Sequence, residues 1–364
     1  MALSTIPTRA LSEQGINFRN LIINGDMSIA QRGTSHSIGS GAAYIIDRYR
    51  DGAIYNTVAP TGVFTVSQST DVPSGQGFSS SQKWDCTTAQ TSLTEQGWGT
   101  QQRIEAQNLT HLAFGTSSAK TLTLSFWIKS NKTGTYGIEV RSHDASRQFI
   151  SSYTIDSANT SEKKTITITG DTSGSGIAND NGIGFWVRWI WSAGTTIDGA
   201  TLNSWTATAT EIAPTGQVNL ADSTSNELYW TGVQLEVGTS ASDFEFLPYD
   251  VNLQRCQRYF YQIQGNDSAN TLLGIGFNND ASSAQSYLKF PTTMRSTPSI
   301  TSSSGLKTGD GNSYTRDATA VSVDSGSNIQ MSVNITASSL TVFRGAFNVL
   351  SNSASSHIAF SSEL

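Results

Sequence analysis

The chain has 364 residues, of which 14% are charged, and its formal net charge is −6. This length is enough for two domains with cores of their own, whereas the charged share lies well below the roughly 25% of an average soluble domain. The acidic balance and the lack of a basic stripe exclude nucleic acid as the expected partner, and no apolar run is long enough to cross a bilayer.

Residues 1–19 form a polar lead-in without periodicity. They contain no apolar stretch after a basic start, so they do not read as a secretory signal. Such an end is ordered only where a partner ties it down. A turn or two of helix is expected at 11–18 and again at 251–260, each at the edge of a domain.

Residues 20–250 read as one large antiparallel β-sandwich. In TLTLSFWIK at 121–129, apolar and polar residues alternate with a period of two, the signature of a half-buried strand. The apolar face holds Leu122, Leu124, Phe126 and Ile128. The same rule applies to YGIEV (136–140), KKTITIT (163–169), GFWVRWIW (184–191) and YWTGVQLEV (229–237). Gly/Ser turns separate these stretches, which is typical of a sandwich or barrel.

Two of these strands allow a prediction of which side chains face the core. In 184–191 the core face is predicted to hold Phe185, Val187, Trp189 and Trp191, with Trp186, Arg188 and Ile190 on the opposite face. In 229–237, strict alternation places Thr231, Val233, Leu235 and Val237 opposite Trp230, Gln234 and Glu236.

The stretch that follows is predicted to close the sandwich. Residues 238–242 supply a turn of small residues, and Pro248 stops further pairing. Aromatic and aliphatic side chains are expected to pack beneath the sandwich, namely Phe244, Phe246 and Leu247. The acids are expected to form a solvated rim, namely Glu236, Asp243 and Glu245. This place is therefore interpreted as a seam between domains rather than as a ligand site.

Residues 251–364 are predicted to form a smaller, distal β domain. Its strands are expected at QSYLKF (285–290), NIQMSVNI (328–335), LTVFRGAF (340–347) and SHIAFSSEL (356–364). No short-period repeat is visible, which argues against a propeller or solenoid.

Residues with metal or catalytic chemistry form no recognisable motif. The four histidines have no metal-ligand spacing, and no glycine-rich phosphate loop lies between a strand and a helix. Carboxylate pairs such as Glu139 with Asp144 or Asp47 with Asp51 read as turn or salt-bridge residues. Cys86 and Cys256 are far apart and read as buried thiols. We therefore expect no metal, no cofactor and no enzyme activity.

The aromatic residues are the best candidates for ligand contact. Eight tryptophans occur in a polar chain, and flat aromatic faces are suited to the apolar faces of sugars. The candidates for carbohydrate binding are Trp84 and Trp98, which sit among polar residues and glycines, Trp127 on the polar face of its strand, and Trp186 on the face opposite the predicted core face. Packing, or cover by a second subunit, is the alternative for each of them.

Four pieces of sequence occur in an order that resembles phage tail-fibre and appendage proteins. They are NLIINGDMSIAQRGT (20–34), YIIDRYR (44–50), YWTGVQLEVGTSASDFEFLPYD (229–250), and RCQRYFYQI with FPTTMRSTPSI (290–300). The large domain also resembles jelly-roll carbohydrate-binding modules, whose opening strand reads like NLIINGD and packs beside the last strand. Many of those modules hold a structural Ca²⁺, but Met27 and Ser28 stand where an acid would be, so a turn role is expected for Asp26.

The resemblance implies a fold and a role. The fold is all-β, a large jelly-roll-like antiparallel sandwich at 20–250 followed by a smaller distal β-sandwich at 251–364, with residues 1–19 as an attachment segment to other tail or capsid proteins. The role is a virion tail-fibre or receptor-binding subunit, made in the host cytoplasm and assembled as a homotrimer. It would recognise a bacterial surface polysaccharide without catalysis, its weak contacts multiplied by copy number. The alternatives are a structural capsid or tail decoration protein with no ligand and, third, a glycan depolymerase.

Overall fold

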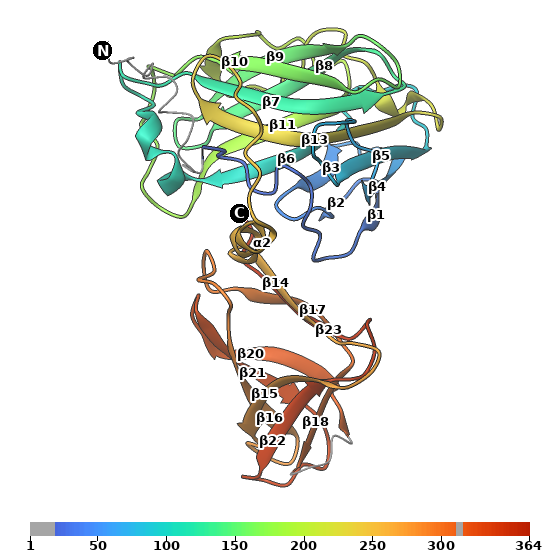
Figure 1. Cartoon of the computed structure of the whole chain (residues 1–364), viewed down its shortest axis with the longest axis vertical. Helices are drawn as coiled ribbons and strands as arrows, with labels where there is room; N and C mark the ends of the chain where they lie inside the picture. Colours follow the sequence, from blue (N-terminus) through green and yellow to red (C-terminus); the bar gives the residue numbers. More distant parts are fainter. Residues whose placement is uncertain (1–18, 311–315) are drawn as a thin grey trace, which may run out of the picture.

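The computed structural model describes residues 19–310 and 316–364, which fold almost entirely into β-strands (Figure 1). A large unit in blue to yellow lies above a smaller unit in orange to red. Between them lies α2 (Tyr249–Gln257), the one α-helix of the described part. The expected all-β class is therefore confirmed. The predicted attachment segment 1–19 and the helical turn at 11–18 lie outside the described residues, except for Arg19.

The large unit is a sandwich of two antiparallel sheets. Sheet A has six strands, in the order β1 (Ser35–Ile38), β4 (Val63–Ser69), β5 (Ser81–Thr88), β13 (Glu227–Val237), β7 (Leu122–Ser130) and β10 (Glu162–Ile168). Sheet B has seven, in the order β12 (Trp205–Ala207), β9 (Arg147–Ile155), β8 (Gly134–Ser142), β11 (Ile183–Ala193), β6 (Gly97–Glu105), β3 (Arg50–Ile54) and β2 (Ala42–Tyr44). Short 3₁₀ turns occur at η1 (Ala106–Asn108), η2 (Thr110–Leu112) and η3 (Leu220–Asp222).

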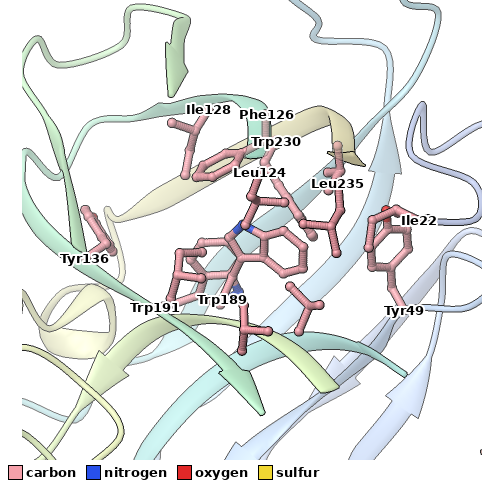
Figure 2. Close-up of a cluster of buried hydrophobic side chains, with 14 of the residues drawn as sticks. Ile22, Tyr49, Leu124, Phe126, Ile128, Tyr136, Trp189, Trp191, Trp230 and Leu235 are labelled. Carbon is pink, nitrogen blue, oxygen red and sulfur yellow. The ribbon is translucent and has the colours of Figure 1, made fainter. Parts of the chain in front are cut away.

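The core between the sheets is aromatic, as Figure 2 shows. Trp230 of β13 lies at its centre, with ring centroids 4.7 Å from Trp189, 5.5 Å from Trp191 and 5.3 Å from Tyr49. The predicted inward faces of β7 and β11 are confirmed, because all of their apolar members are buried in this core. Period-two alternation in these two strands therefore does place one face against the opposite sheet.

A polar network lies inside this aromatic core. Asp51 accepts hydrogen bonds from Thr100 Oγ1 (2.7 Å) and Gln82 Nε2 (2.9 Å). Gln82 Oε1 in turn accepts from the indole Nε1 of Trp230 (2.8 Å) and of Trp84 (3.1 Å). Burial raises the pKa of the Asp51 carboxyl well above its usual value, although these hydrogen bonds act against it. The network satisfies the indole donors of Trp84 and Trp230, whereas Nε1 of Trp189 is buried without a partner in the described residues.

Replacing Asp51 with asparagine is expected to raise stability relative to the wild type by an amount that grows with pH. The folded wild type binds the Asp51 proton more tightly than the unfolded chain, whose carboxyl titrates near 3.8. The Asp51 contribution to stability is thus fully present below about pH 4 and is lost as pH rises towards the folded pKa. An asparagine carries no charge to bury. Its amide can donate to Thr100, whose hydroxyl already lies 3.3 Å from Gln82 Oε1.

Urea unfolding of both proteins from pH 4 to pH 8 tests this expectation. The difference in the free energy of unfolding between variant and wild type should increase steadily over that range. Other titrating groups, including Asp47, whose pKa burial raises to about 6, are common to both proteins and cancel in the difference. A difference that stays constant with pH would contradict the assignment.

The opening segment runs beside the closing strand without forming a regular strand. Leu21 N donates to Leu235 O (2.9 Å), and Val233 N donates to Gly25 O (2.9 Å). Asn20 completes the pairing with its side chain, since its Nδ2 donates to Val233 O and its Oδ1 accepts from Leu235 N. A Cβ on Gly25 would lie 2.1 Å from Val233 O, so this close approach requires glycine. NLIINGD lies where the resemblance implies, but as an irregular segment.

The predicted alternation in β13 is wrong on one side of a bulge. The register shifts between Thr231 and Gln234, and Gly232 in between has φ 64°. An extra residue in one strand moves the following side chains to the other face. As a result Trp230 and Leu235 both face the core, whereas strict alternation put them on opposite faces.

The distal unit has three small antiparallel sheets. They are β14 (Phe260–Gln264), β23 (His357–Ser361) and β17 (Ser299–Ser304); β15 (Thr271–Phe277), β22 (Gly345–Leu350), β18 (Leu306–Asp310) and β19 (Arg316–Asp317); and β16 (Ser283–Lys289), β21 (Gln330–Thr336) and β20 (Ala320–Gly326). Their core is separate from that of the large sandwich. The strand predicted at 340–347 begins only at Gly345, because Phe343 adopts φ 57° in a turn and is 85% exposed.

The junction between the units is held by buried charges. Glu105 of β6 accepts two hydrogen bonds of 2.7 Å from Arg258 and one of 2.5 Å from the Tyr259 hydroxyl. Nearby, Glu363 forms ion pairs with Arg32 and Arg48 of the large unit, and the Arg48 guanidinium lies 3.4 Å over the ring of Tyr259. These contacts link the start and the end of the distal unit to the same region of the sandwich.

Most of the acidic and aromatic side chains in residues 236–247 help to close the large sandwich. Phe244 and Phe246 each lie 5.1 Å from the ring of Phe78, so both rings pack as expected, but Phe246 remains 50% exposed. Glu236, however, is not a solvated rim residue. It is 5% exposed and accepts hydrogen bonds from Gln234 Nε2 and from Ser242 N and Oγ.

Candidate functional site on the outer face of sheet B

The four predicted tryptophans do not form one site. Trp84 and Trp98 have no exposed surface, so the prediction that they contact a glycan is wrong. Trp84 alternates with Lys83 and Asp85, whose outward positions turn the indole inward. Trp98 stands between two glycines, which give no sign of the face it takes.

Trp127 and Trp186 are both half-buried, but they lie on opposite outer faces of the sandwich. Trp127 belongs to β7 of sheet A, where it packs against Gly232 at the β13 bulge. The hollow beside it is of about 10 Å³, which is too small for a ligand. Trp186 belongs to β11 of sheet B and lies among charged side chains.

Three guanidinium groups surround Trp186. Strand register places Trp186 between Arg141 of β8 and Arg103 of β6 in one cross-strand row. The guanidinium carbons of Arg188, Arg103 and Arg141 lie 4.3, 5.0 and 5.3 Å from the centre of the indole ring. Contacts of this length are cation–π interactions, which hold the cations in place.

A second row runs parallel to the first. It reads Glu139 (β8), Arg188 (β11), Gln101 (β6) and Arg50 (β3) from strand to strand. Glu139 is fully buried and is shared, with Oε1 3.1 Å from Arg141 Nε and Oε2 3.2 Å from Arg188 Nη1. We call the two rows together the arginine–tryptophan face: Arg50, Gln101, Arg103, Glu139, Arg141, Trp186 and Arg188.

A hollow of about 210 Å³ opens beside this face, between Trp186, Arg188 and Arg50. Its floor is backbone at Gly52 and Gly99, which pair across β3 and β6 and bring no side chain. A second hollow of about 360 Å³ adjoins it, because both are lined by Ile54, Tyr55 and Arg188. This extended hollow reaches the size of known ligand sites, roughly 300–1,000 Å³.

Burial and nearby like charges shift the pKa values of the arginines on this face. Burial lowers the pKa of Arg188 from its usual value, and the nearby cations Arg141, Arg50 and Arg103 lower it further against the attraction of Glu139. Burial and neighbouring arginines likewise lower the pKa of Arg103. Guanidinium groups stay charged in proteins. The lowered pKa values therefore reflect burial of the guanidinium groups first and the like charges close to them second.

A larger cavity, of about 790 Å³, lies elsewhere, between β6 and α2. Its wall includes Arg19, the first described residue. Its other three arginines are already used by the junction: Arg258 binds Glu105, Arg103 donates to Leu364 O (2.5 Å), and Arg255 donates to Asn20 O (3.4 Å). We therefore take the arginine–tryptophan face as the candidate site.

Sequence reasoning found Trp186 but missed the arginines around it. The outward position of Arg188 follows from the alternation of 184–191, and that was the available signal. Arg50, Arg103 and Arg141 come from three other strands, so only the pairing of β3, β6 and β8 with β11 brings them together.

Two further observations limit the chemistry available. Among residues 19–310 and 316–364 no group of three or more His, Cys, Asp or Glu side chains could hold a metal ion. In the same residues no helix has the length and apolar character needed to cross a membrane. Asp26, for which a turn role is expected, lies in a turn and accepts a hydrogen bond from Asn252 Nδ2 (3.1 Å), and Cys86 and Cys256 are buried free thiols.

No protein-family model matches the sequence, and no curated protein matches it either. The solved structures that match this chain include carbohydrate-binding modules and a phage tailspike domain. The C-terminal family 22 module of Clostridium thermocellum Xyn10B is 10% identical, with a TM-score of 0.32, over 63% of this chain and 100% of that one. A family 11 module from Clostridium thermocellum is 15% identical, with a TM-score of 0.26, over 60% and 94%.

The phage structure is the enzymatically active domain of tailspike protein 4 from bacteriophage CBA120. It is 11% identical with a TM-score of 0.32, and the match covers 61% of this chain and 22% of the tailspike chain. The function proposed next rests on the geometry of the arginine–tryptophan face and on the sequence motifs.

Proposed function

We propose that this chain is a glycan-recognition subunit of a phage appendage, and that it binds a bacterial surface glycan on the arginine–tryptophan face without catalysis. The observation that carries the proposal is the hollow beside Trp186, which has a backbone floor and is walled by Tyr55, Arg50 and Arg188. An aromatic wall with convergent hydrogen-bond donors is the arrangement that orients a sugar ring.

The location on a virion is supported by the four motifs that resemble tail-fibre proteins, of which NLIINGD and YWTGVQLEV lie side by side in the fold. The proposal includes a homotrimer, in which exposed apolar side chains of the distal unit such as Leu272, Ile275 and Tyr287 would be covered. Antibody labelling of phage particles and mass by light scattering test these two parts.

Replacing Trp186 with alanine is expected to weaken glycan binding at least about tenfold, because the aromatic wall of the hollow is lost. The measurement is an array of bacterial capsular and lipopolysaccharide glycans, followed by titration of those that bind. Tyr55→Ala is a second variant on the same wall, and its 39% exposed side chain can be removed without touching the core.

The matched control is Trp127→Ala, which removes a half-buried tryptophan from the opposite sheet and should leave binding within about twofold of the wild type. Binding that survives both Trp186→Ala and Tyr55→Ala, or that is lost with Trp127→Ala, would place the site elsewhere. Release of reducing ends from a bound polysaccharide would overturn the non-catalytic part of the proposal.

A further inference from the structure

The arginine–tryptophan face carries more positive charge than the nearby carboxylates neutralise. The chain as a whole has a net charge of −6, yet this face holds four arginines and one carboxylate, Glu139. Glu139 is already shared by Arg141 and Arg188. Glu105, next along β6, is occupied by Arg258. The face is thus a local cationic site on an acidic protein.

One of its arginines, Arg50, has no counter-ion in the described part of the chain. Within residues 19–310 and 316–364, no carboxylate side chain forms an ion pair with Arg50. Arg103, by contrast, is held by the main-chain oxygen of Leu364 at the junction. Arg50 lines the 210 Å³ hollow opposite Arg188. Its guanidinium group is therefore available to an external anion.

A buried amide without a partner lies between them. Gln101 is 4% exposed and lines the same hollow, and its Nε2 is buried without a hydrogen-bond partner in the described residues. An unsatisfied buried donor costs free energy, about 1–3 kcal/mol in typical cases. Strand register puts Gln101 directly between Arg188 and Arg50. The row therefore presents three donor groups in line, and the middle one has no protein partner in the described residues.

The hydrogen-bond donors of the face indicate which kind of sugar it can bind. A neutral sugar offers hydroxyl groups, which need acceptors as well as donors. Arg50 and Arg188 have donors only, and the one carboxylate of the face is engaged. A carboxylate, sulfate or phosphate offers acceptors only and can take paired hydrogen bonds from the planar guanidinium fork. The chemistry of the face matches an anion attached to a saccharide.

We propose that the ligand of the arginine–tryptophan face is an acidic saccharide, whose anionic substituent is held by Arg50, Gln101 and Arg188 while its ring lies over Gly52 and Gly99 beside Trp186. This inference rests on the proposed glycan-binding function and names the class of glycan.

The test uses the full chain and polysaccharide pairs that differ only in charge. Hyaluronan, alginate and polygalacturonate are each compared with their carboxyl-reduced forms, and dextran sulfate is compared with dextran. Titration at low and at physiological salt should show binding to at least one acidic member, at least about tenfold weaker binding to its neutral partner, and an affinity that falls with salt. The carboxylate and sulfate pairs separate the two sources of charge.

Arg50→Gln is the informative variant, because Arg50 forms no ion pair in the described structure whose loss would disturb folding. It is expected to weaken binding of the acidic probe about tenfold or more, since a hydrogen bond to a charged group is lost. Lys163→Gln is the matched control, since it removes one exposed positive charge from β10 on the opposite sheet and should leave the affinity within about twofold.

The outcomes separate the two proposals. Equal binding of charged and neutral partners, lost in Trp186→Ala, would overturn the acidic class and leave glycan recognition on this face standing. Binding of acidic probes that Arg50→Gln and Lys163→Gln weaken equally would reduce the effect to overall charge and overturn the assigned site. No binding to any acidic probe at low salt would also overturn the inference.

Discussion

Replacing Trp230 with alanine lowers the free energy of unfolding of the large sandwich by about 3–5 kcal/mol, the range expected for truncating a fully buried tryptophan. Trp230 is 1% exposed and contacts Trp189, Trp191 and Tyr49 at the centre of the core (Figure 2). Alanine leaves a cavity among rigid rings that cannot close around it. It also removes one of the two indole donors to Gln82 Oε1.

Urea unfolding followed by near-ultraviolet circular dichroism measures the loss, since that signal reports on packed aromatic rings. The control is Trp230→Phe, which keeps a ring in place and removes the indole donor. It should cost about 1–2 kcal/mol. A loss below about 1 kcal/mol for the alanine variant would mean that the two sheets do not pack around this residue.

Replacing Glu105 with alanine is expected to loosen the junction at a cost of about 2–4 kcal/mol, because it leaves the partner charge of a buried pair without its counter-ion. The Glu105 side chain is fully buried, whereas that of Arg258 is 28% exposed. Burial acts to raise the pKa of Glu105, but the hydrogen bonds from Arg258 and Tyr259 outweigh it and lower the pKa. The stabilisation by Glu105 is thus present above about pH 4.5 and is lost as pH falls through the lowered pKa.

Hydrogen exchange of the α2 amides measures this opening locally, because Glu363 and its two arginines still connect the units. Exchange in α2 should become faster in Glu105→Ala while the core strands β7 and β11 keep their protection. The control is Glu227→Ala, which breaks a half-exposed pair with Lys83 on sheet A and should cost less than about 1 kcal/mol. Unchanged exchange in α2 would show that Glu105 does not hold the junction.

Much of the sandwich could be predicted from the sequence because its strands alternate. β7 and β11 each carry four apolar residues at every second position, and the hydrophobic effect then fixes which face is buried. The prediction for the closing strand, β13, was wrong at a single point, the bulge at Gly232. A glycine at this position does not by itself predict a left-handed conformation. The bulge that it forms changed the face taken by the residues after it relative to the residues before it.

The candidate site could be predicted only in part, for a different reason. Polar neighbours along the chain suggested that Trp84 was exposed, but in a strand the adjacent residues point to the other face, so their polarity says little about the indole. The arginine–tryptophan face depends on the pairing of four strands that are distant in sequence. Period-two patterns define faces within a strand, and they do not specify which strands become neighbours.

The position of the last strand has a mechanical consequence. β14, which enters the distal unit, and β23, which returns from it, pair along their length and both end beside α2. A pull on the far tip in Figure 1 would therefore be shared by two strands under tension. At their base the load would meet the pair of Glu105 with Arg258, just before β14, and the pair of Glu363 with Arg48, just after β23. Such a double anchor suits an element that must stay aligned with the sandwich while its tip is pushed or dragged against another surface.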